Sequence, residues 1–317
     1  MAVIHNVRRP ASTGRGLILR ENWRTFRLAA WLGWQLEANW ADPLVFLIFS
    51  VLRPLASALI LVVMFQVIAG GQRGGFFDYL YLSNAFFMLV ISALSGMPWA
   101  ILEDREHFRM LKYIYTSPAR KLAYLSGRAV AKLALGLLTT VVLLGTGALL
   151  LGLRLDINRV QWGWLVPYFL LGMVVLLALG LVLAGVALVV ARHGGFIGEV
   201  VGGSLLLFSG AYFPIDILPP VLREVGLLLP VTYWLEAMRR AMTGGIVTIT
   251  ESGISGAGTA PVQHTPVSPA LAGIDNGQLL LILMASAAIC ALGAYLFYSW
   301  VERLAKERGM IDRLTGY

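Results

Sequence analysis

Cysteine and charge are scarce in this sequence, and each scarcity excludes a class of protein. The single cysteine, Cys290, rules out a disulfide within one chain and any site built from several cysteines. Only 13% of the 317 residues are charged, whereas an average soluble domain carries about a quarter. Hydrophobic residues make up 58% of the chain. This composition indicates an integral membrane protein.

Motifs for nucleotide or metal chemistry are missing as well. No G-x-x-x-x-G-K-[ST] occurs, so the chain lacks the loop that cradles ATP phosphates. The histidines are scattered over separate segments, which argues against a metal site. A G-x-S-G pattern that begins at Gly253 resembles that of intramembrane serine proteases, but it stands in a polar loop, and we reject it. Catalytic residues are therefore not expected in this chain.

Apolar stretches long enough to cross a membrane recur along the chain. A transmembrane helix needs about 20 apolar residues. Candidate spans lie at about 44–69, 78–102, 128–153, 164–191 and 278–300, with a shorter one at 196–213. The sequence therefore predicts an all-α polytopic membrane protein with six transmembrane helices, all within a domain that covers residues 41–317.

The distribution of lysine and arginine predicts the orientation of these spans. Residues 1–40, the loop at 103–127 and the tail after residue 300 are all basic, whereas the loop after the first span holds only Arg73. Because cytoplasmic loops are enriched in Lys and Arg, both termini and the 103–127 loop are predicted to be cytoplasmic. This topology and anionic lipid headgroups explain the net charge of +8, so nucleic acid is not an expected partner.

Residues 1–40 are predicted to form a basic arm followed by an amphipathic helix from about Leu17 to Asn39. Large apolar residues such as Trp23, Phe26 and Trp34 recur there at three- and four-residue spacing beside arginines. This pattern is typical of a helix that lies in the membrane interface. A helix packed on a protein partner is the alternative.

The segment 208–240 is apolar but interrupted by prolines. Four prolines, the first Pro214 and the last Pro230, each block a straight helix. Irregular backbone at membrane depth must be buried in protein or line a wet cavity. We therefore expect an extracellular re-entrant helical hairpin between spans five and six, followed by an exposed loop at 243–277.

A second irregular segment, residues 103–128, combines a helical stripe with a stop signal. Phe108, Leu111 and Tyr115 fall on one face of a helix, and charged residues fill the other face. Pro118 disfavours further helix at the residue before it. Such a short helix is either a docking surface for a cytoplasmic partner or a connector whose apolar face rests on its own bundle.

Two motifs in these segments resemble those of the ABC-2 family of ATP-binding-cassette permeases. The first is similar to the family pattern E-x-E-x-G-T-[L]-x-x-L-x-x-[ST]-P followed by G-[KR], and consists of Glu103, the short helix, Thr116-Ser117-Pro118 and Gly127-Arg128. The Gly-Thr of that pattern is replaced here by His107-Phe108. The second resembles the family's extracellular hairpin, and consists of Phe208-Ser209-Gly210, Phe213-Pro214, Leu218-Pro219, Leu229-Pro230-Val231-Thr232-Tyr233 and Glu236-Ala237-Met238-Arg239.

The resemblance implies the permease subunit of an ATP-driven exporter in a bacterial plasma membrane. Two such subunits, identical or related, would enclose a pathway in the lipid, and two cytoplasmic ATPases would dock on the helix at 104–116. Those ATPases would bind ATP and Mg, and this chain would hold no cofactor. The implied cargo is amphipathic, drug-like or lipid-linked. A polysaccharide or teichoic-acid-type polymer is the alternative cargo, and a membrane-embedded enzyme or sensor subunit is the alternative from another class.

The candidate functional residues form three groups. The ATPase-coupling group is Glu103, Arg105, Phe108, Arg109, Leu111, Lys112, Tyr115 and Pro118. The group of the external hairpin is Phe213, Pro214, Leu218, Pro219, Pro230, Tyr233, Glu236 and Arg239. The possible substrate pathway contains Arg53, Tyr212 and Trp234. The coupling group has the connector alternative given above. In the other two groups, Arg53 could extend to the inner interface, Glu236 could pair locally with Arg239 and Arg240, and the aromatic side chains could form an interface belt.

Overall fold

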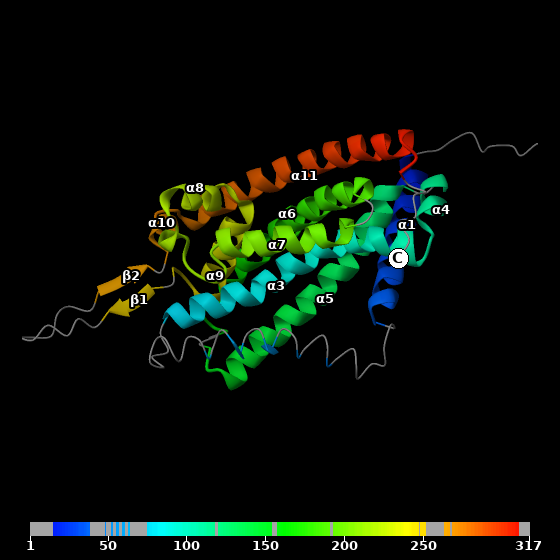
Figure 1. Ribbon diagram of the computed structural model, residues 1–317. Helices are drawn as coiled ribbons and strands as arrows, with labels where there is room; N and C mark the ends of the chain where they lie inside the picture. Colours follow the sequence, from blue (N-terminus) through cyan, green and yellow to red (C-terminus); the bar gives the residue numbers. More distant parts are fainter. Residues whose placement is uncertain are drawn as a thin grey trace, which may run out of the picture.

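Long helices that run side by side along one axis dominate the computed structural model (Figure 1). The structure describes residues 15–38, 75–117, 120–153, 157–190, 193–246, 248–251, 263–266 and 268–310, with isolated positions between 48 and 63. The predicted helical membrane architecture is thus confirmed in its main feature. The predicted first span, 44–69, lies outside the continuously described residues.

Four of the helices are long and apolar enough to cross a membrane. They are α3 (Gly75–Leu102), α5 (Lys121–Leu150), α6 (Trp162–Val189) and α11 (Asn276–Glu307). These helices correspond to the predicted spans at 78–102, 128–153, 164–191 and 278–300. Helix α5 starts earlier than its apolar run, since residues 121–127 extend the helix toward the end of the bundle.

The predicted span at 196–213 is a shorter helix than expected. It consists of the 3-10 turn η2 (Gly194–Phe196) and α7 (Ile197–Phe208), which together form an apolar helix below the length of the other four. The chain turns directly after α7, at Gly210, whose φ of 75° favours glycine. The helix therefore ends before Pro214, where the prediction had placed its end.

Helix α3 lies at the centre of the bundle and α11 at its edge. Side chains along α3, among them Phe87, Val90 and Leu94, are buried against the neighbouring helices. Helix α11 packs mainly on α6 and exposes large apolar side chains such as Leu281 and Ile289. An apolar face of this kind is suited to lipid contact.

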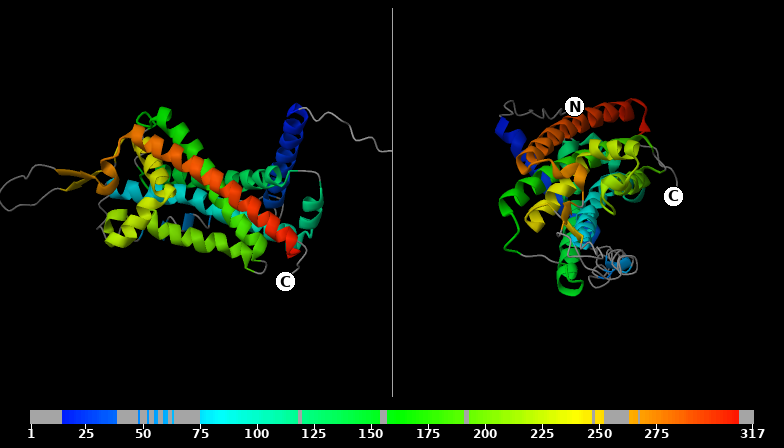
Figure 2. Two further views of the ribbon diagram at one scale, coloured as in Figure 1. Left: turned by 90° about the horizontal axis from the view of Figure 1, so that it is seen from above. Right: turned by 90° about the vertical axis from the view of Figure 1, so that its left-hand side faces the viewer.

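Helix α1 (Arg15–Ala38) matches the predicted amphipathic helix and crosses the bundle axis steeply (Figures 1 and 2). Its Ala29 packs against α5, whereas Trp23 and Trp31 are exposed. The crossing is close because Gly127 of α5 has no side chain: a Cβ there would lie 2.5 Å from the carbonyl oxygen of Phe26. The location of α1 in a membrane interface stays a prediction.

The opposite end of the bundle carries the proline-rich segment. After α7 come the 3-10 turn η3 (Ile215–Ile217), α8 (Pro220–Leu228) and α9 (Pro230–Thr243). Each of these α-helices starts with a proline at its first position, where the missing N–H costs nothing. The two short helices that the expected hairpin requires are therefore present, and we call them the hairpin below; their re-entrant place in a membrane stays a prediction.

The described parts of the predicted loop at 243–277 contain regular structure that the sequence did not indicate. Strand β1 (Thr248–Glu251) pairs antiparallel with β2 (Gln263–Pro266), and the short helix α10 (Pro269–Ala272) follows. The description as all-α therefore needs a correction: a two-stranded ribbon extends from this end (Figure 1). Alternation of polar and apolar residues over four positions is too short to predict a strand from sequence.

Candidate functional site

The hairpin holds a buried ion cluster on α9. Glu236 accepts hydrogen bonds from Arg239, with Nη2 at 2.7 Å from Oε2, and from Arg240, with Nε at 2.8 Å from Oε1. All three side chains are nearly inaccessible to solvent. The local pairing expected from their spacing is thus present, but in the protein interior rather than on a surface.

The two arginines of this cluster reach three other segments. Arg239 donates to the Ser83 hydroxyl of α3 at 2.7 Å and lies over the ring of Tyr79, 4.1 Å from its centroid. Arg240 donates to the carbonyl oxygens of Leu271 and Ile274, which precede α11. The cluster therefore ties the hairpin to α3 and to the start of α11.

Electrostatics keep this cluster ionised. Burial alone would raise the pKa of Glu236, but the charges and hydrogen bonds of Arg239 and Arg240 outweigh it and hold that pKa below its ordinary value. A carboxylate in this state compensates two buried guanidinium groups. The cluster is therefore a structural anchor, and it shows no group poised to transfer a proton.

The other hairpin candidates are divided between surface and interior. Pro219 is exposed, Pro214 is buried, and the side chains of Phe213, Leu218, Pro230 and Tyr233 are partly buried. Tyr212 is also partly buried. Trp234 is 1% exposed and packs against Phe86 and Gly172. This burial argues against the predicted place of Trp234 on a substrate pathway.

At the other end of the bundle, the predicted coupling helix is broken in two. Helix α3 continues into one turn of π-helix, η1 (Glu103–His107), and a separate helix, α4, spans Leu111–Thr116. Between them the chain turns at Arg109, whose φ is 50°. The continuous helix at 104–116 that the sequence indicated is therefore interrupted, and the angular relation between Phe108 and the residues of α4 changes.

The break decides which candidates face outward. Leu111 is buried on the bundle, and the Tyr115 hydroxyl lies 2.7 Å from that of Tyr298 in α11. Phe108, Arg109 and Lys112 are exposed. Tyr113, which the sequence did not single out, and Thr116, which it gave only as part of the first motif, are exposed as well. The interpretation as a connector thus fits the Leu111–Tyr115 side of α4, whereas the side with Phe108 and Tyr113 is exposed.

The residues of the first motif come together behind α4. Arg128 donates to Glu103 at 2.8 Å, and its Nη2 lies 3.7 Å from Asp104. Tyr124 donates to Asp104 at 2.8 Å. Sequence reasoning selected Glu103 and noted Gly127-Arg128, but it missed Asp104 and Tyr124 as partners. Tyr124 lies one turn before Arg128 on α5, and this spacing was the available signal.

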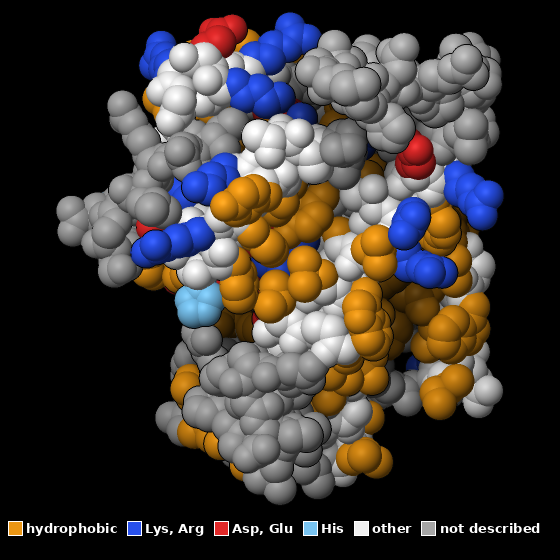
Figure 3. All heavy atoms as spheres, turned by 90° about the vertical axis from the view of Figure 1, so that its right-hand side faces the viewer, with side chains coloured by type: hydrophobic (Ala, Val, Ile, Leu, Met, Phe, Trp, Pro, Cys, Tyr) orange, Lys and Arg blue, Asp and Glu red, His pale blue; other side chains and the backbone are white. Residues whose placement is uncertain are grey.

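Further contacts join this end to three helices. Arg105 donates to the carbonyl oxygen of Leu188 near the end of α6, at 2.7 Å. Lys132 of α5 forms ion pairs with Glu103 and with Glu37 of α1. Figure 3 looks onto this end, and Lys and Arg side chains are distributed over it. Arg53 and Pro118 lie outside the described residues.

The described residues offer no group of His, Cys, Asp and Glu side chains that could hold a metal ion. The two clusters combine a few acidic side chains with arginine, lysine and tyrosine, and this donor set suits structural ion pairing. The α4 end has an exposed surface of basic and aromatic side chains. At the hairpin end, the buried ion cluster holds α9 against α3 and the start of α11.

Comparison with known proteins identifies the family. Residues 26–243 match the family model described as ABC-2 type transporter, which is more than half of the chain. No curated protein matches the sequence at a significant level. Members of this family are permease subunits of transporters, and they generally work with an ATP-binding-cassette ATPase. The match confirms the resemblance of the two motifs: this chain belongs to the ABC-2 type transporter family.

Proposed function

We propose that this chain is the membrane subunit of an ATP-driven exporter. The observation that carries the proposal is the exposed face of the α4 region, with Phe108, Arg109 and Tyr113, at one end of a bundle of apolar helices. Short helices that expose aromatic and basic side chains are suited to a groove on a partner protein. In this family the expected partner is the ATPase.

The proposed topology has six spans with both termini in the cytoplasm of a bacterial cell. It adds the segment 44–69 and the shorter helix Gly194–Phe208 to the four long helices. The basic residues at the α4 end support a cytoplasmic location for that end. The hairpin then lies at the external end, as a re-entrant element between spans five and six.

The contacts behind α4 suggest how movement would pass from the ATPases to the bundle. Glu103 is joined to α5, Arg105 to α6 and Tyr115 to α11. A force on α4 and on the turn η1 before it would therefore act on three spans at once. Two ATPase subunits, which bind ATP and Mg, would dock on two copies of this surface and change the arrangement of the two permease subunits.

The external hairpin would seal the exit and contact the second subunit. Helix α9 is anchored by the Glu236 cluster, whereas α8 exposes an apolar stripe with Val221, Val225 and Leu228, and Ile217 of the preceding turn η3 is exposed as well. An exposed stripe of this kind needs a covering partner or lipid. The apolar character of the bundle favours an amphipathic, drug-like or lipid-linked cargo over a highly charged one.

The test is co-purification of the chain with its ATPase. Phe108→Asp and Tyr113→Asp each place a charge on the exposed face, and we expect both variants to lose the ATPase and the ATP-dependent transport. Ile157→Asp is the control, because it places the same charge on an exposed side chain at the opposite end of the molecule, outside the α8 stripe. Normal ATPase binding by both α4-end variants would refute the docking surface.

A further inference from the structure

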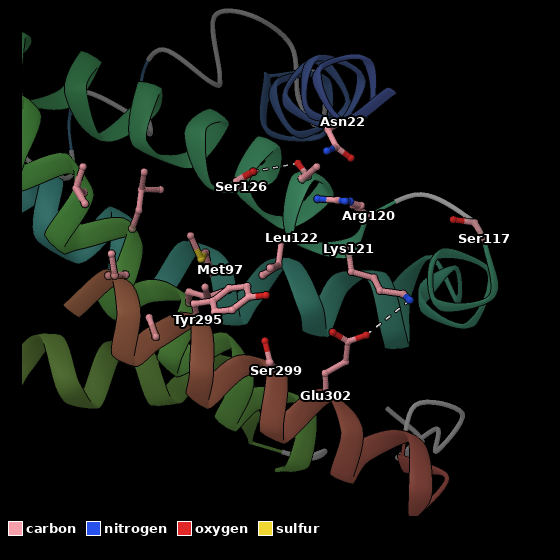
Figure 4. A pocket seen from close by; sticks show the side chains of 17 residues that line it. Asn22, Met97, Ser117, Arg120, Lys121, Leu122, Ser126, Tyr295, Ser299 and Glu302 are labelled. Atoms are coloured by element: carbon pink, nitrogen blue, oxygen red, sulfur yellow. Dashed lines mark hydrogen bonds and ion pairs between the residues drawn. The ribbon is translucent and has the colours of Figure 1, made fainter. Parts of the chain in front are cut away.

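A cleft of about 980 Å³ opens between α5, α6 and α11 near the α4 end (Figure 4). Its wall is apolar and includes Met97 of α3, Val174, Leu177 and Leu181 of α6, and Ala291 and Tyr295 of α11. We call it the α5–α6–α11 cleft. Its volume is in the upper range of small-molecule sites, which are roughly 300–1,000 Å³.

The mouth of the cleft is polar and carries positive charge. Arg120 and Lys121 lie there with Asn22 of α1 and Glu302 of α11 (Figure 4). Lys121 is 3.7 Å from Glu302, so these two charges offset each other. Among the described residues none pairs with Arg120, which is exposed. The guanidinium of Arg120 is therefore available to an anion.

The first turn of α5 adds to the positive potential at the mouth. The helix begins at Lys121, and no side chain caps its first N–H groups. Such a terminus carries a partial positive charge. It reinforces Arg120, whose position at the rim of the cleft provides the main attraction for an anion.

The cleft has the depth of one lipid leaflet. Its wall on α11 runs from Glu302 at the mouth to Ala291, which is about 16 Å at 1.5 Å per residue. One leaflet contributes about half of the roughly 30 Å hydrocarbon core. Because α5, α6 and α11 are long and apolar enough to cross a membrane, we expect lipid chains around this apolar wall.

We propose that the α5–α6–α11 cleft binds an anionic glycerophospholipid. The phosphate lies at Arg120 and the uncapped first turn of α5, and an acyl chain lies along the apolar wall toward Ala291. The combination of one unpaired guanidinium with a deep apolar wall selects an amphiphile with an anionic head. The bound lipid bridges α1, α5 and α11 beside the proposed docking surface.

This proposal does not depend on transport. The charge at the mouth and the apolar wall would select the lipid whether or not an ATPase docks at α4. If the α4 end faces the cytoplasm, as proposed above, the lipid lies in the inner leaflet. Only this choice of leaflet rests on the proposed orientation. A binding measurement on the full chain therefore tests the site separately from the proposed function.

The experiment is native mass spectrometry of the full-length chain titrated with phosphatidylglycerol or phosphatidylcholine. We expect tighter retention of phosphatidylglycerol. Arg120→Gln should weaken phosphatidylglycerol binding roughly fivefold, the effect of one basic side chain near a membrane surface, and leave phosphatidylcholine binding unchanged. Ala291→Trp, which fills the apolar wall, should weaken the binding of both lipids.

Two matched controls make the result specific. Arg308→Gln removes an exposed arginine from the same end, and Ala285→Trp adds the same bulk to an exposed position of α11; neither residue lines the cleft. Both controls should bind lipid as the parent chain does. The proposal is overturned if the parent chain does not distinguish the two lipids, or if Arg120→Gln binds phosphatidylglycerol as the parent does. Arg120 is exposed, so its variant tests the site even if Ala291→Trp does not fold.

Discussion

At the scale of residues, buried charges hold both ends of the bundle. At the hairpin end Glu236 compensates two arginines, and at the α4 end Arg128 pairs with Glu103 and lies close to Asp104. A buried charge without its partner costs far more than the pair contributes. These clusters therefore make the position of each end sensitive to single substitutions.

Glu236→Gln is expected to destabilise the protein strongly. The amide keeps the size of the side chain but leaves Arg239 and Arg240 without a counter-charge, and both are nearly inaccessible to solvent. Loss of one partner from a buried ion pair costs about 3–5 kcal/mol. Thermal unfolding of the purified protein in detergent should show a lower transition temperature.

Glu224→Gln provides the matched control for this prediction. Glu224 lies on α8 of the same hairpin and is exposed. Exposed charges contribute about 0–1 kcal/mol, so this variant should unfold as the parent protein does. Equal unfolding temperatures for the Glu236 and Glu224 variants would show that the cluster does not anchor the hairpin.

The same carboxylate predicts a dependence on pH. The folded-state pKa of Glu236 lies below its ordinary value of 4.5. Its contribution to stability is therefore complete above pH 4.5 and is lost as the pH falls through the lowered folded-state pKa. The difference in stability between the parent and Glu236→Gln should stay constant from pH 7 to 5 and shrink in more acidic solution. A difference that grows with acidity would contradict the direction of the shift.

At the scale of elements, the close crossing of α1 and α5 depends on a glycine. A Cβ at Gly127 would lie 2.5 Å from the Phe26 carbonyl oxygen and 2.7 Å from the Ala29 Cβ. Backbone atoms cannot move aside as a flexible side chain can. The Gly127-Arg128 motif thus has two structural roles, since the glycine admits α1 and the arginine pairs with Glu103.

Gly127→Ala is expected to separate α1 from α5 and to lower stability. Added volume at a tight contact costs about 1–3 kcal/mol. Gly145→Ala is the control in the same helix, because a Cβ there meets nothing within 4 Å. That substitution should not destabilise, since alanine favours a helix over glycine. Thermal unfolding of both variants gives the comparison, and equal stability would refute the steric argument.

Sequence patterns predicted where helices lie in the chain better than they predicted which side of a helix is buried. Apolar runs and prolines are local signals, so the long spans and the α8–α9 hairpin were predictable. The face of α4 was not, because the turn at Arg109 breaks the period on which Phe108 and Leu111 were grouped. The burial of Trp234 was likewise hidden, because it depends on the space left by Gly172 in another helix.

At the scale of the whole molecule, the two ends differ in chemistry. The end with α1, α4 and the terminus of α11 is basic, and the other end carries the hairpin, the ribbon and the 157–161 loop. Gln161 joins that loop to the hairpin, since its N–H donates to Ala241 and its side chain to Gly244. The proposed orientation can therefore be tested by finding which of the two ends faces the cytoplasm.

Cysteine labelling of intact cells answers this question. In a Cys290→Ala background, Ile157→Cys places one thiol at the hairpin end and Arg308→Cys places one at the α4 end, both at exposed positions. Because the basic end is expected to stay inside, a membrane-impermeant maleimide should label the cysteine at 157 in intact cells and the one at 308 only after permeabilisation. The unsubstituted Cys290→Ala protein reports background labelling. The reverse pattern would place the α4 surface outside the cell, where no ATPase could reach it, and would refute both the orientation and the proposed coupling.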